Sequence, residues 1–459
     1  MKLRLFKRKI VIIAFLVVVF VLAGIYPMIH KKNADVETSN TLKIYAVGTD
    51  SRVSNGLQDT LDEFQKKYPN IKIKKVLFDV NNIEKYEKTL LSDTLAGKGP
   101  DVLYLTSSDA KKLQRSGMLQ DLKTLIDKDK SFNKEDYNNK IINAGMYNGK
   151  LTLMPLDYYV NQYATTKELL NSNRINLKAD SSEKDFIKAV EAGNLNGGRK
   201  LFAAVGGADP VGNMNLSDFL AGSGYQFIDY ENKKVYFDKP EFKELIEDYK
   251  KIYKASAKKA EGEGSSGEEG LQALKSGAAL FSNDRMDSFK DFLSSESLIN
   301  GITKETSCIN NMPMLEGGDK VVGIVSESMA INKNSKNKEA AYNFIKCALS
   351  TEVQSKACRQ TSYIPVNNKV VKEFEDEYKS EIGKSYEYDK NDTVVQKPLS
   401  SDFQNYVNKV TNNVEKGTII DDSVNNLMME CLTPYFQDKT SYESAINTLQ
   451  SKVKIYINE

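Results

Sequence analysis

Short clusters of oxygen-bearing side chains follow two predicted strands near the N-terminus of the chain. They are Thr49 and Asp50 after the first strand, and Thr106, Ser107, Ser108 and Asp109 after the third. In an open parallel α/β sheet, ligands bind just beyond the carboxyl ends of the strands. Hydroxyls and carboxylates at that edge can hydrogen-bond a small polar molecule. These six residues are therefore the first candidates for contact with a ligand.

Several kinds of catalysis need residue types that the body of the chain lacks. The only histidine is His30, beside an apolar N-terminal segment, so a Ser-His-Asp triad, a Cys-His pair and a histidine zinc site are excluded. Cys308, Cys347, Cys358 and Cys431 lack metal-site spacing. We expect buried free thiols, and a disulfide is the alternative. The 62 acidic residues leave a glycosidase with two carboxylates as an unspecific alternative.

Three predicted strands position the two polar clusters. Residues 41–48 and 71–78 are rich in strand formers, and the first of them alternates in polarity. Residues 100–105 are nearly all apolar, as expected of a strand that is buried on both faces.

Two stretches between these strands have helical periodicity. Residues 54–70 place Leu57, Leu61, Phe64 and Tyr68 on one face, and Pro69 ends the helix. Residues 86–99 turn Tyr86, Leu90, Leu91 and Leu95 inward. The alternation of strands and helices predicts a parallel sheet with right-handed crossovers.

The first 32 residues have the layout of a secretory signal. Five basic residues precede Ile10 to Tyr26, which is 17 residues without a charge, near the lower limit of roughly 17 for a membrane span. Leu22-Ala23-Gly24 is followed by Ile25, where a lipoprotein signal has a cysteine. We predict an uncleaved signal anchor within residues 1–32 and a tether over residues 33–40. Cleavage and release of the body is the alternative.

The charge of the exported body argues against nucleic acid as a partner. Residues 1–32 hold seven of the 64 Lys and Arg residues and none of the 62 acidic residues, so the rest has a net charge of −5. A nucleic-acid binder would show a strong basic excess. An apolar content of 40% supports real cores, and the length predicts two or three domains at roughly 150 residues each.

Six segments after residue 40 are informative as an ordered set. They are LDEFQKKYPNIKIKKV, GKGPDVLYLTSSD, NGKLTLMPLDYYVNQYATTKELL, FIDYENKKVYFDKPEFKELIEDYKKIY, LQALKSGAALFSND and GIVSESMAINKNSKNKEAAYNFIKCALSTEVQ. Each segment is weak evidence alone, and the order is the strong signal. In this order they resemble landmarks of the extracellular solute-binding proteins of ABC importers, in the group with the maltose-type sugar binders.

The resemblance implies a two-lobed periplasmic-binding-protein-like α/β fold, in which each lobe is a mostly parallel sheet flanked by helices. Hinge closure would trap solute between the lobes. Lobe 1 would comprise residues 41–156 and 324–364, and lobe 2 residues 164–320 and 366–459. The Gly/Ser/Glu-rich residues 260–270 are expected to form a solvated loop.

The resemblance also implies which residues contact solute. Sugars stack on aromatic rings, and tyrosine must fill that role because the chain has 24 tyrosines and no tryptophan. Asp157, Tyr158 and Tyr159 lie in the first crossing between lobes, where alternation along an extended segment sends the two rings to opposite sides. Besides the cluster at residues 106–109, the implied contacts are Tyr225, Ser282, Asn283, Asp284, Ser326, Glu327, Ser401 and Gln404.

The function that the resemblance implies is a receptor on the outer face of a bacterial cytoplasmic membrane. It would be a monomer without metal, cofactor or enzymatic activity, and would deliver a sugar or short oligosaccharide to an ABC permease. Leu105 and Arg285-Met286 stand where maltose-type members carry tryptophans, so a long linear oligosaccharide is disfavoured. The alternatives are a sensory module of the same fold and a ferric-ion binder that uses Tyr158 and Tyr159.

Overall fold

The computed structural model describes twelve stretches of the chain. They are residues 41–49, 52–53, 55–79, 83–178, 181–192, 199–202, 215–256, 270–282, 288–315, 320–359, 363–387 and 392–458. The predicted anchor and tether, Asp50, Asn283, Asp284 and all of the predicted loop except Gly270 lie outside them. Within these stretches, every helix is too short or too polar to cross a bilayer. Leu42–Glu459 forms a single unit.

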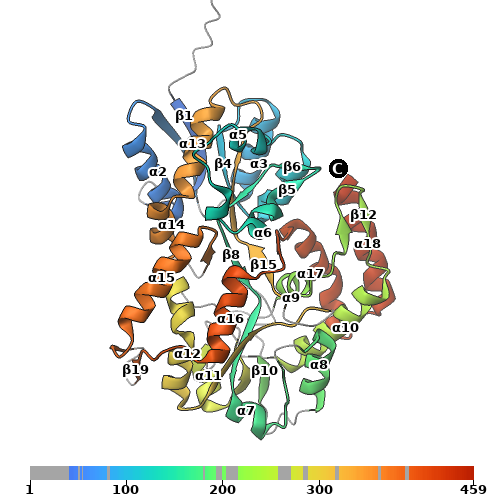
Figure 1. The fold of residues 1–459 in the computed structure, drawn as a ribbon. Helices are drawn as coiled ribbons and strands as arrows, with labels where there is room; N and C mark the ends of the chain where they lie inside the picture. The colour runs from blue at the N-terminus through green and yellow to red at the C-terminus, as the bar shows by residue number, and fades with distance from the viewer. Residues whose placement is uncertain are drawn as a thin grey trace, which may run out of the picture. The chain divides into compact units, whose positions relative to one another are not determined.

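A six-stranded sheet organises the N-terminal part of this unit (Figure 1). Its strands are β2 (Arg52–Val53), β1 (Thr41–Thr49), β4 (Val102–Thr106), β16 (Glu327–Ile331), β7 (Met154–Pro155) and β3 (Lys72–Phe78), which pairs with β1. The predicted parallel pairing holds between β1 and β4, with Ile44 opposite Val102. The sheet is mixed, because β16 returns from far along the chain and pairs antiparallel with both β4 and β7.

Helices cover this sheet as the apolar spacing predicts. The helices are α2 (Asn55–Lys67), α3 (Ile83–Leu95), α4 (Ser107–Arg115), α5 (Lys123–Ile126), α6 (Asn139–Ile142), α13 (Lys338–Ala348) and α14 (Thr351–Ala357), with short turns η1 (Lys134–Asp136) and η2 (Asn143–Gly145) and the hairpin β5 (Met146–Tyr147) and β6 (Lys150–Leu151). Phe64 of α2 is fully buried and lies 5.3 Å, ring to ring, from Phe344 of α13. The inward placement of Leu95 was wrong, since this last residue of α3 is 57% exposed.

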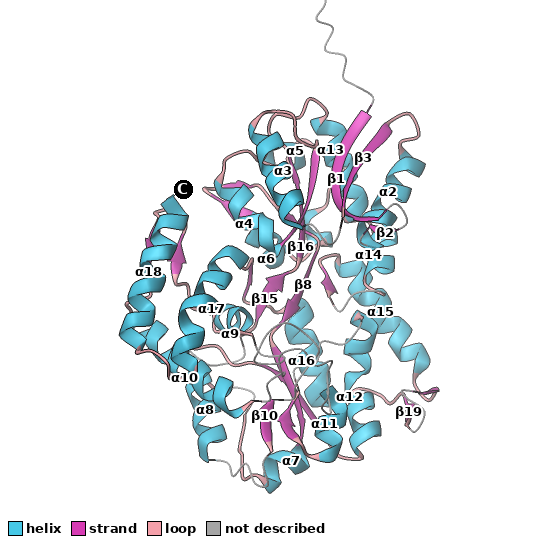
Figure 2. Cartoon of the chain, turned by 180° about the vertical axis from the view of Figure 1, so that it is seen from behind, coloured by secondary structure: helices cyan, strands magenta, loops and turns pink. Residues whose placement is uncertain are grey.

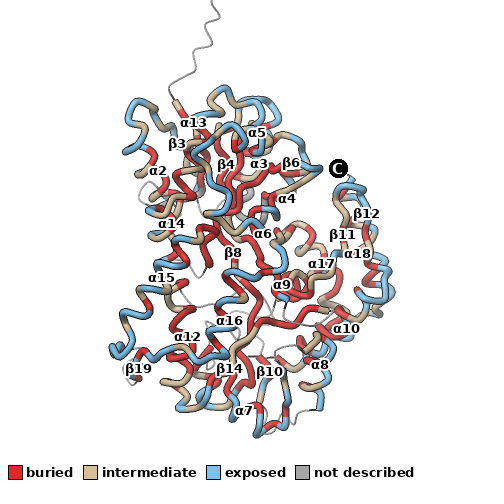
Figure 3. The backbone as a smooth tube through the Cα atoms, viewed as in Figure 1, coloured by how far each residue is buried: buried red, intermediate tan, exposed pale blue. Residues whose placement is uncertain are grey.

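A second sheet of four strands carries the chain between two halves of the unit. It comprises β17 (Ile364–Pro365), β8 (Asp157–Val160), β15 (Val322–Val325) and β20 (Lys416–Thr418). Strand β8 directly follows β7 of the first sheet, and β15 directly precedes β16 of the same sheet. Asp157, Tyr158 and Val160 of β8 are buried, and Tyr159 is half-buried (Figure 3). Two neighbouring antiparallel strands therefore make both crossings.

The other half is built on shorter strand pairs. Its strands are β9 (Gln162–Thr166) with β14 (Ser307–Asn311), β10 (Lys200–Phe202) with β13 (Ala279–Phe281), and β11 (Ile228–Asp229) with β12 (Lys234–Val235). Its helices are α7 (Lys167–Ser172), α8 (Glu183–Ala192), α9 (Leu216–Gly222), α10 (Pro240–Ala255), α11 (Gly270–Ser276) and α12 (Phe289–Thr303). The ring of Phe281 joins this core, since it lies 5.1 Å from Tyr163 and 5.5 Å from Phe186.

Four helices and a hairpin complete the chain. They are α15 (Asn368–Glu381), α16 (Ser401–Asn412), α17 (Asp422–Phe436), α18 (Tyr442–Asn458) and the strands β18 (Ser385–Glu387) and β19 (Thr393–Val395). Figure 2 shows α17 and α18 packed together on one side of the unit, and Figure 1 shows β12 beside α18. All four cysteines are free thiols, and Cys347, Cys358 and Cys431 are buried.

A carboxyl group is buried at the start of α8. Glu183 is fully buried, and neither of its carboxyl oxygens has a hydrogen-bond partner among the described residues. Asp248, Glu244 and Lys251 face it from α10, and Lys251 Nζ lies 2.7 Å from an oxygen of Asp248. Burial, and then the charge of Asp248, raise the pKa of Glu183 to about 9. Glu183 is therefore protonated at neutral pH.

Replacing Glu183 with glutamine is expected to flatten the dependence of stability on pH. The pKa of this carboxyl rises from 4.5 to about 9 on folding, so the folded protein holds a proton that the unfolded chain releases. The wild-type free energy of unfolding therefore falls as the pH rises through that window, and this loss is absent from Glu183→Gln. Thermal denaturation across the window measures both slopes. Glu247→Gln, an exposed position of α10, is the control, and equal slopes in all three proteins would contradict the assignment.

Candidate functional site

Two acidic side chains meet where the crossing strands leave the first sheet. Asp157 begins β8, and Glu327 begins β16 two residues after β15 ends. The backbone N–H of Glu327 donates to Asp157 Oδ1 at 3.1 Å. Thr106, the last residue of β4, is the backbone partner of Glu327. The sheet thus brings together Thr106, Asp157, half-buried Ser326 and Glu327, all of which were candidates from the sequence.

Burial makes these carboxyls hard to ionise. The pKa of Asp157 lies well above its usual range because the group is desolvated and faces the charge of Glu327. Burial also raises the pKa of Glu327, although the Tyr104 hydroxyl donates a hydrogen bond to its carboxylate. The pKa of the Cys358 thiol is raised by burial and by both carboxyls, so this cysteine is a poor nucleophile.

The rings of Tyr158 and Tyr159 lie in different surroundings. Tyr158 is fully buried, and its hydroxyl donates to the carbonyl oxygen of Val410 in α16 at 2.8 Å. Its ring packs against Gly323 of β15, where a Cβ would lie 2.9 Å from Tyr158 Cδ2 and 2.3 Å from Ile141 Cδ1. Glycine at position 323 therefore makes room for the buried ring.

Replacing Gly323 with alanine is expected to lower the free energy of unfolding by about 1–3 kcal/mol, because the new methyl group overpacks the strand against the Tyr158 ring. Chemical denaturation measures the change. Gly56→Ala is the matched control, since a Cβ there meets its nearest atom at an ordinary 3.6 Å. Equal stability of the two variants would show that the close approach at Gly323 is not restrictive.

Tyr159 is half-buried and reaches toward the second half of the unit. Its hydroxyl donates to Asp218 Oδ1 of α9 at 2.8 Å. Asn215 caps that helix by accepting from the Asp218 backbone N–H at 2.7 Å, and its side-chain amide donates to Asp218 Oδ2 at 3.1 Å. The ring of Tyr363 lies 5.9 Å from that of Tyr159, tilted by 36°. Two aromatic faces and a positioned carboxylate thus lie beside the crossing strands.

The remaining predicted residues lie in several places. The backbone places Thr49 at the end of β1 and Ser107, Ser108 and Asp109 in the first turn of α4. Ser282 is buried, and its backbone bridges Ala164. Ser401 and Gln404 are exposed on α16, and Gln404 borders a hollow with Leu293 and Tyr378. The structure does not bring these last three residues into contact with the Asp157–Glu327 pair.

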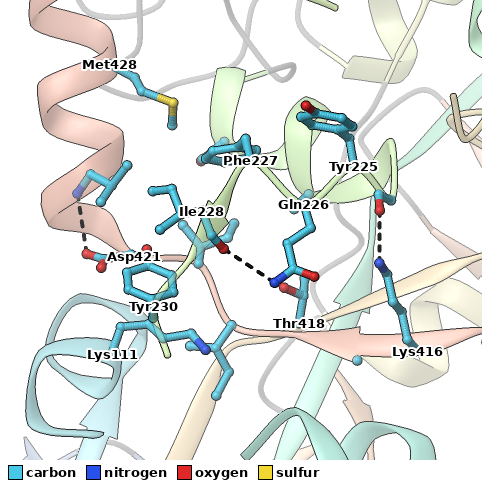
Figure 4. A pocket seen from close by; sticks show the side chains of 17 residues that line it. Lys111, Tyr225, Gln226, Phe227, Ile228, Tyr230, Lys416, Thr418, Asp421 and Met428 are labelled. Carbon is cyan, nitrogen blue, oxygen red and sulfur yellow. Dashed lines mark hydrogen bonds between the residues drawn. The ribbon is translucent and has the colours of Figure 1, made fainter. Parts of the chain in front are cut away.

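Tyr225 lines a cavity of about 270 Å³ that α4 of the first half shares with elements of the second half and the C-terminal part (Figure 4). The tyrosine hydroxyl donates to the carbonyl oxygen of Tyr236 at 3.4 Å. The other contributions come from α4, from α9 and β11, and from the segment that joins β20 to α17. The cavity touches the four-stranded sheet at its edge strand β20, through Gly417 and Thr418.

Three residues of these surroundings were not among the candidates from the sequence. They are Asp218, Tyr363 and Lys111, which lines the cavity from α4. Asparagine is a common N-cap residue, and acids are favoured in the first turn of a helix. An asparagine three residues before Asp218 is therefore a signal that a helix starts there with Asp218 in its first turn. Lys111 adjoins Ala110 and Gln114, both buried in α4, so its position beside the buried face of that helix was a usable signal.

Comparisons with known proteins agree with this geometry. A family model described as bacterial extracellular solute-binding protein matches residues 59–384. No curated protein sequence matches the chain.

Solved structures of sugar-binding proteins share the fold. The sugar-binding protein MalE from Xanthomonas citri superimposes with a TM-score of 0.64 at 15% identity, covering 91% of this chain and 97% of that one. The ABC substrate-binding protein Lmo0181 from Listeria monocytogenes, in complex with cycloalternan, gives a TM-score of 0.60 at 16% identity, covering 91% and 99%. The GacH receptor of Streptomyces glaucescens gives 0.58 at 15% identity, covering 91% and 98%. These likenesses confirm the predicted two-lobed fold.

Proposed function

The chain belongs to the bacterial extracellular solute-binding proteins, and from this premise we propose that it is a receptor that captures a sugar or short oligosaccharide for an ABC permease. The family and the solved neighbours are binding proteins rather than enzymes, as predicted, which removes the glycosidase alternative. The observation that carries the proposal is the half-buried Tyr159, which stands beside Tyr363 and is held by Asp218 across the crossing strands.

The chemistry of this place suits a saccharide. Sugar rings offer C–H faces that pack on aromatic rings and hydroxyls that bond to carboxylates and amides. Tyr159 and Tyr363 provide the rings, and the buried Asp218 holds the Tyr159 hydroxyl in place. Cycloalternan accompanies the Listeria protein, and acarbose accompanies the GacH receptor. Solutes of that class are the natural first probes.

Isothermal calorimetry of the exported body tests the proposal against a panel of mono- to hexasaccharides, amino acids and polyamines. At least one saccharide is expected to bind with micromolar or better affinity. Binding of an amino acid or polyamine by a protein that ignores every saccharide would overturn the sugar assignment.

We infer that lobe 1 comprises residues 41–156 and 324–364 and that lobe 2 comprises residues 164–320 and 366–459. The support is strand pairing, since the chain changes sheets between β7 and β9 and again between β14 and β16. The crossing strands would act as the hinge, because a solute that contacts both lobes stabilises the closed form. Small-angle scattering is expected to show a smaller radius of gyration with bound saccharide, and an unchanged radius at saturation would contradict closure.

We propose that residues 10–26 tether the receptor to the outer face of the membrane. Tethering keeps a receptor at a high effective concentration near its permease without any new contact. Cell fractionation is expected to find the intact chain in the membrane fraction. A mature protein that is free in the medium and begins near Gly24 would show that the segment is a cleaved signal instead.

A further inference from the structure

The cavity beside Tyr225 is positively charged, whereas the exported body as a whole is negative. The charged residues that line it are Lys111, Lys416 and Asp421. Arg115 stands one helical turn beyond Lys111, with its guanidinium 5.5 Å from the ring of Tyr230 and 4.2 Å from that of Tyr456. The body without residues 1–32 has a net charge of −5, so this local excess of cations is opposite in sign to the body as a whole. Such a concave site attracts anions.

The one carboxylate in the wall is already engaged. Asp421 is buried and accepts the Tyr456 hydroxyl at 3.0 and 3.2 Å. It also caps α17 by accepting from the backbone N–H of Val424 at 3.3 Å. A helix N-terminus stabilises a carboxylate through its unpaired N–H groups. The carboxylate of Asp421 is thus engaged by Tyr456 and by the N-terminus of α17. The charged groups left to contact a ligand in the cavity are the lysines.

Lys111 is the cation best placed to meet a ligand. Figure 4 shows its side chain extending past Tyr230 into the cavity. Its ammonium donates to Gln114 Oε1 at 3.3 Å, so its hydrogen-bond partner among the described residues is a neutral amide. Burial lowers the pKa of Lys111 to about 8, although the negative charge of Asp421 acts to raise it. Lys416, in contrast, is exposed, and its ammonium donates to the carbonyl oxygen of Gly224 at 2.9 Å.

The rest of the wall offers rings and apolar surface. Tyr225, Phe227 and Tyr230 present rings, and Ile228, Ile419 and Met428 add apolar area. Gln226 and Thr418 are neutral polar side chains on the same wall. This lining suits a molecule with an apolar face, several hydroxyls and one negative charge. The cavity has a volume of about 270 Å³, near the lower end of the roughly 300–1,000 Å³ of small-molecule sites.

We propose that this cavity takes the carboxylate-bearing end of an acidic saccharide, a uronic-acid sugar or a short oligosaccharide of such sugars, and that Lys111 contacts the carboxylate. The inference rests on the proposed saccharide-binding function and narrows its substrate class. An ammonium that has lost part of its hydration gains more from an anion than an exposed one does. A neutral sugar would leave that gain unused.

The test is calorimetry with matched di- and trisaccharides of glucose, galactose and mannose, each beside its uronic-acid counterpart. A uronic-acid member is expected to bind at least tenfold more tightly than its neutral partner. Lys111→Met should weaken that binding about ten- to a hundredfold, the range of a charged hydrogen bond. Lys111→Arg should retain most of it. Lys112→Met is the matched control, since this neighbour on α4 is exposed and does not line the cavity.

The pH dependence gives a second readout in the wild-type protein. Uronate affinity is expected to fall from about pH 7 to about pH 9 as the Lys111 ammonium loses its proton, and this slope should be absent from Lys111→Met. The charges of Asp421 and Arg115 act on the ammonium, and the Tyr230 ring lies 5.7 Å from it. Lys416 lines the same cavity, and the Tyr456 hydroxyl bonds to Asp421. Burial and the charge of Asp421 raise the pKa of Tyr230 well above its usual range, so its phenol stays protonated over these pH values.

The outcomes separate the two proposals. If neutral saccharides bind as tightly as their uronic-acid partners and Lys111→Met binds them normally, the inference is overturned and the receptor function stands. If no saccharide of either kind binds, both the proposed saccharide receptor function and this inference are overturned. Phenylacetate and hexanoate complete the panel, and their binding in place of any saccharide would contradict the sugar class. If Lys111→Met fails to fold, the inference is still tested in the wild-type protein by the pairs of neutral and uronic-acid saccharides and by the pH dependence of uronate affinity.

Discussion

Replacing Tyr158 with alanine is expected to lower the free energy of unfolding by about 3–5 kcal/mol, the usual cost of a fully buried aromatic side chain. The ring packs against Gly323 of β15, and its hydroxyl bonds to the Val410 carbonyl of α16. Truncation opens a cavity at the strands that join the two halves and leaves that carbonyl without this partner. Chemical denaturation monitored by circular dichroism measures the loss.

Tyr158→Phe separates the ring from the hydroxyl. It keeps the packing and removes the hydroxyl, which donates to the carbonyl oxygens of Val410 and Thr411 and accepts from Asn138 Nδ2. The expected loss is about 1 kcal/mol. Under conditions in which the variant is fully folded, the solute affinity of Tyr158→Phe should be nearly unchanged. A Tyr158→Ala protein as stable as the wild type would show that the crossing strands do not depend on this core.

Replacing Tyr159 with alanine is expected to act on binding instead. The side chain is half-buried and stands beside Tyr363, so its removal takes away a stacking face for the solute. The free energy of binding to the saccharide identified by calorimetry should weaken by about 1–3 kcal/mol, as for other aromatic contacts. The melting temperature of the unliganded protein should shift far less than in Tyr158→Ala.

Tyr159→Phe is the matched control for this position. It keeps the ring and removes the hydrogen bond to Asp218. The affinity that Tyr159→Ala loses beyond the loss in Tyr159→Phe is therefore due to stacking. Normal solute binding by both Tyr159 variants would show that the segment is only a hinge, and the contact assignment for this residue would be wrong.

Sequence periodicity predicts much of this fold because the pattern is local. The residues of β1, β3 and β4 and of helices α2 and α3 were predicted to within a few positions, since the spacing of their apolar residues is set by the strand and helix repeats. Leu95 is the exception, and its reason is also local. The buried face of α3 runs through Tyr86, Leu90 and Thr94, so Thr94 fills the inward position of the last turn and Leu95 lies off that face.

The partners of the polar side chains were less predictable. Tyr159 and Asp218 are 59 residues apart, and Tyr104 and Glu327 are 223 apart. The sequence predicts Tyr104 to be a core residue, and its ring is indeed buried. Its hydroxyl nevertheless donates a hydrogen bond to the carboxylate of Glu327, at the start of β16. Nothing in the local pattern of β4 marks that contact, because the other partner arrives from a distant strand. Hydrogen bonds of this kind follow only from the assembled topology.

The position of β16 in its sheet has a consequence for the order in which the protein is made. This strand lies between β4 and β7, and it is the only hydrogen-bonded link between them in the described sheet. A ribosome that has produced residues 41–320 has therefore made both neighbours but not the strand that joins them. Until residue 331 emerges, β4 and β7 present open edges, which are prone to wrong pairing and aggregation. The first half therefore cannot complete its sheet until residues 164–320 of the second half have been synthesised, so the nascent chain stays incompletely folded for most of its translation.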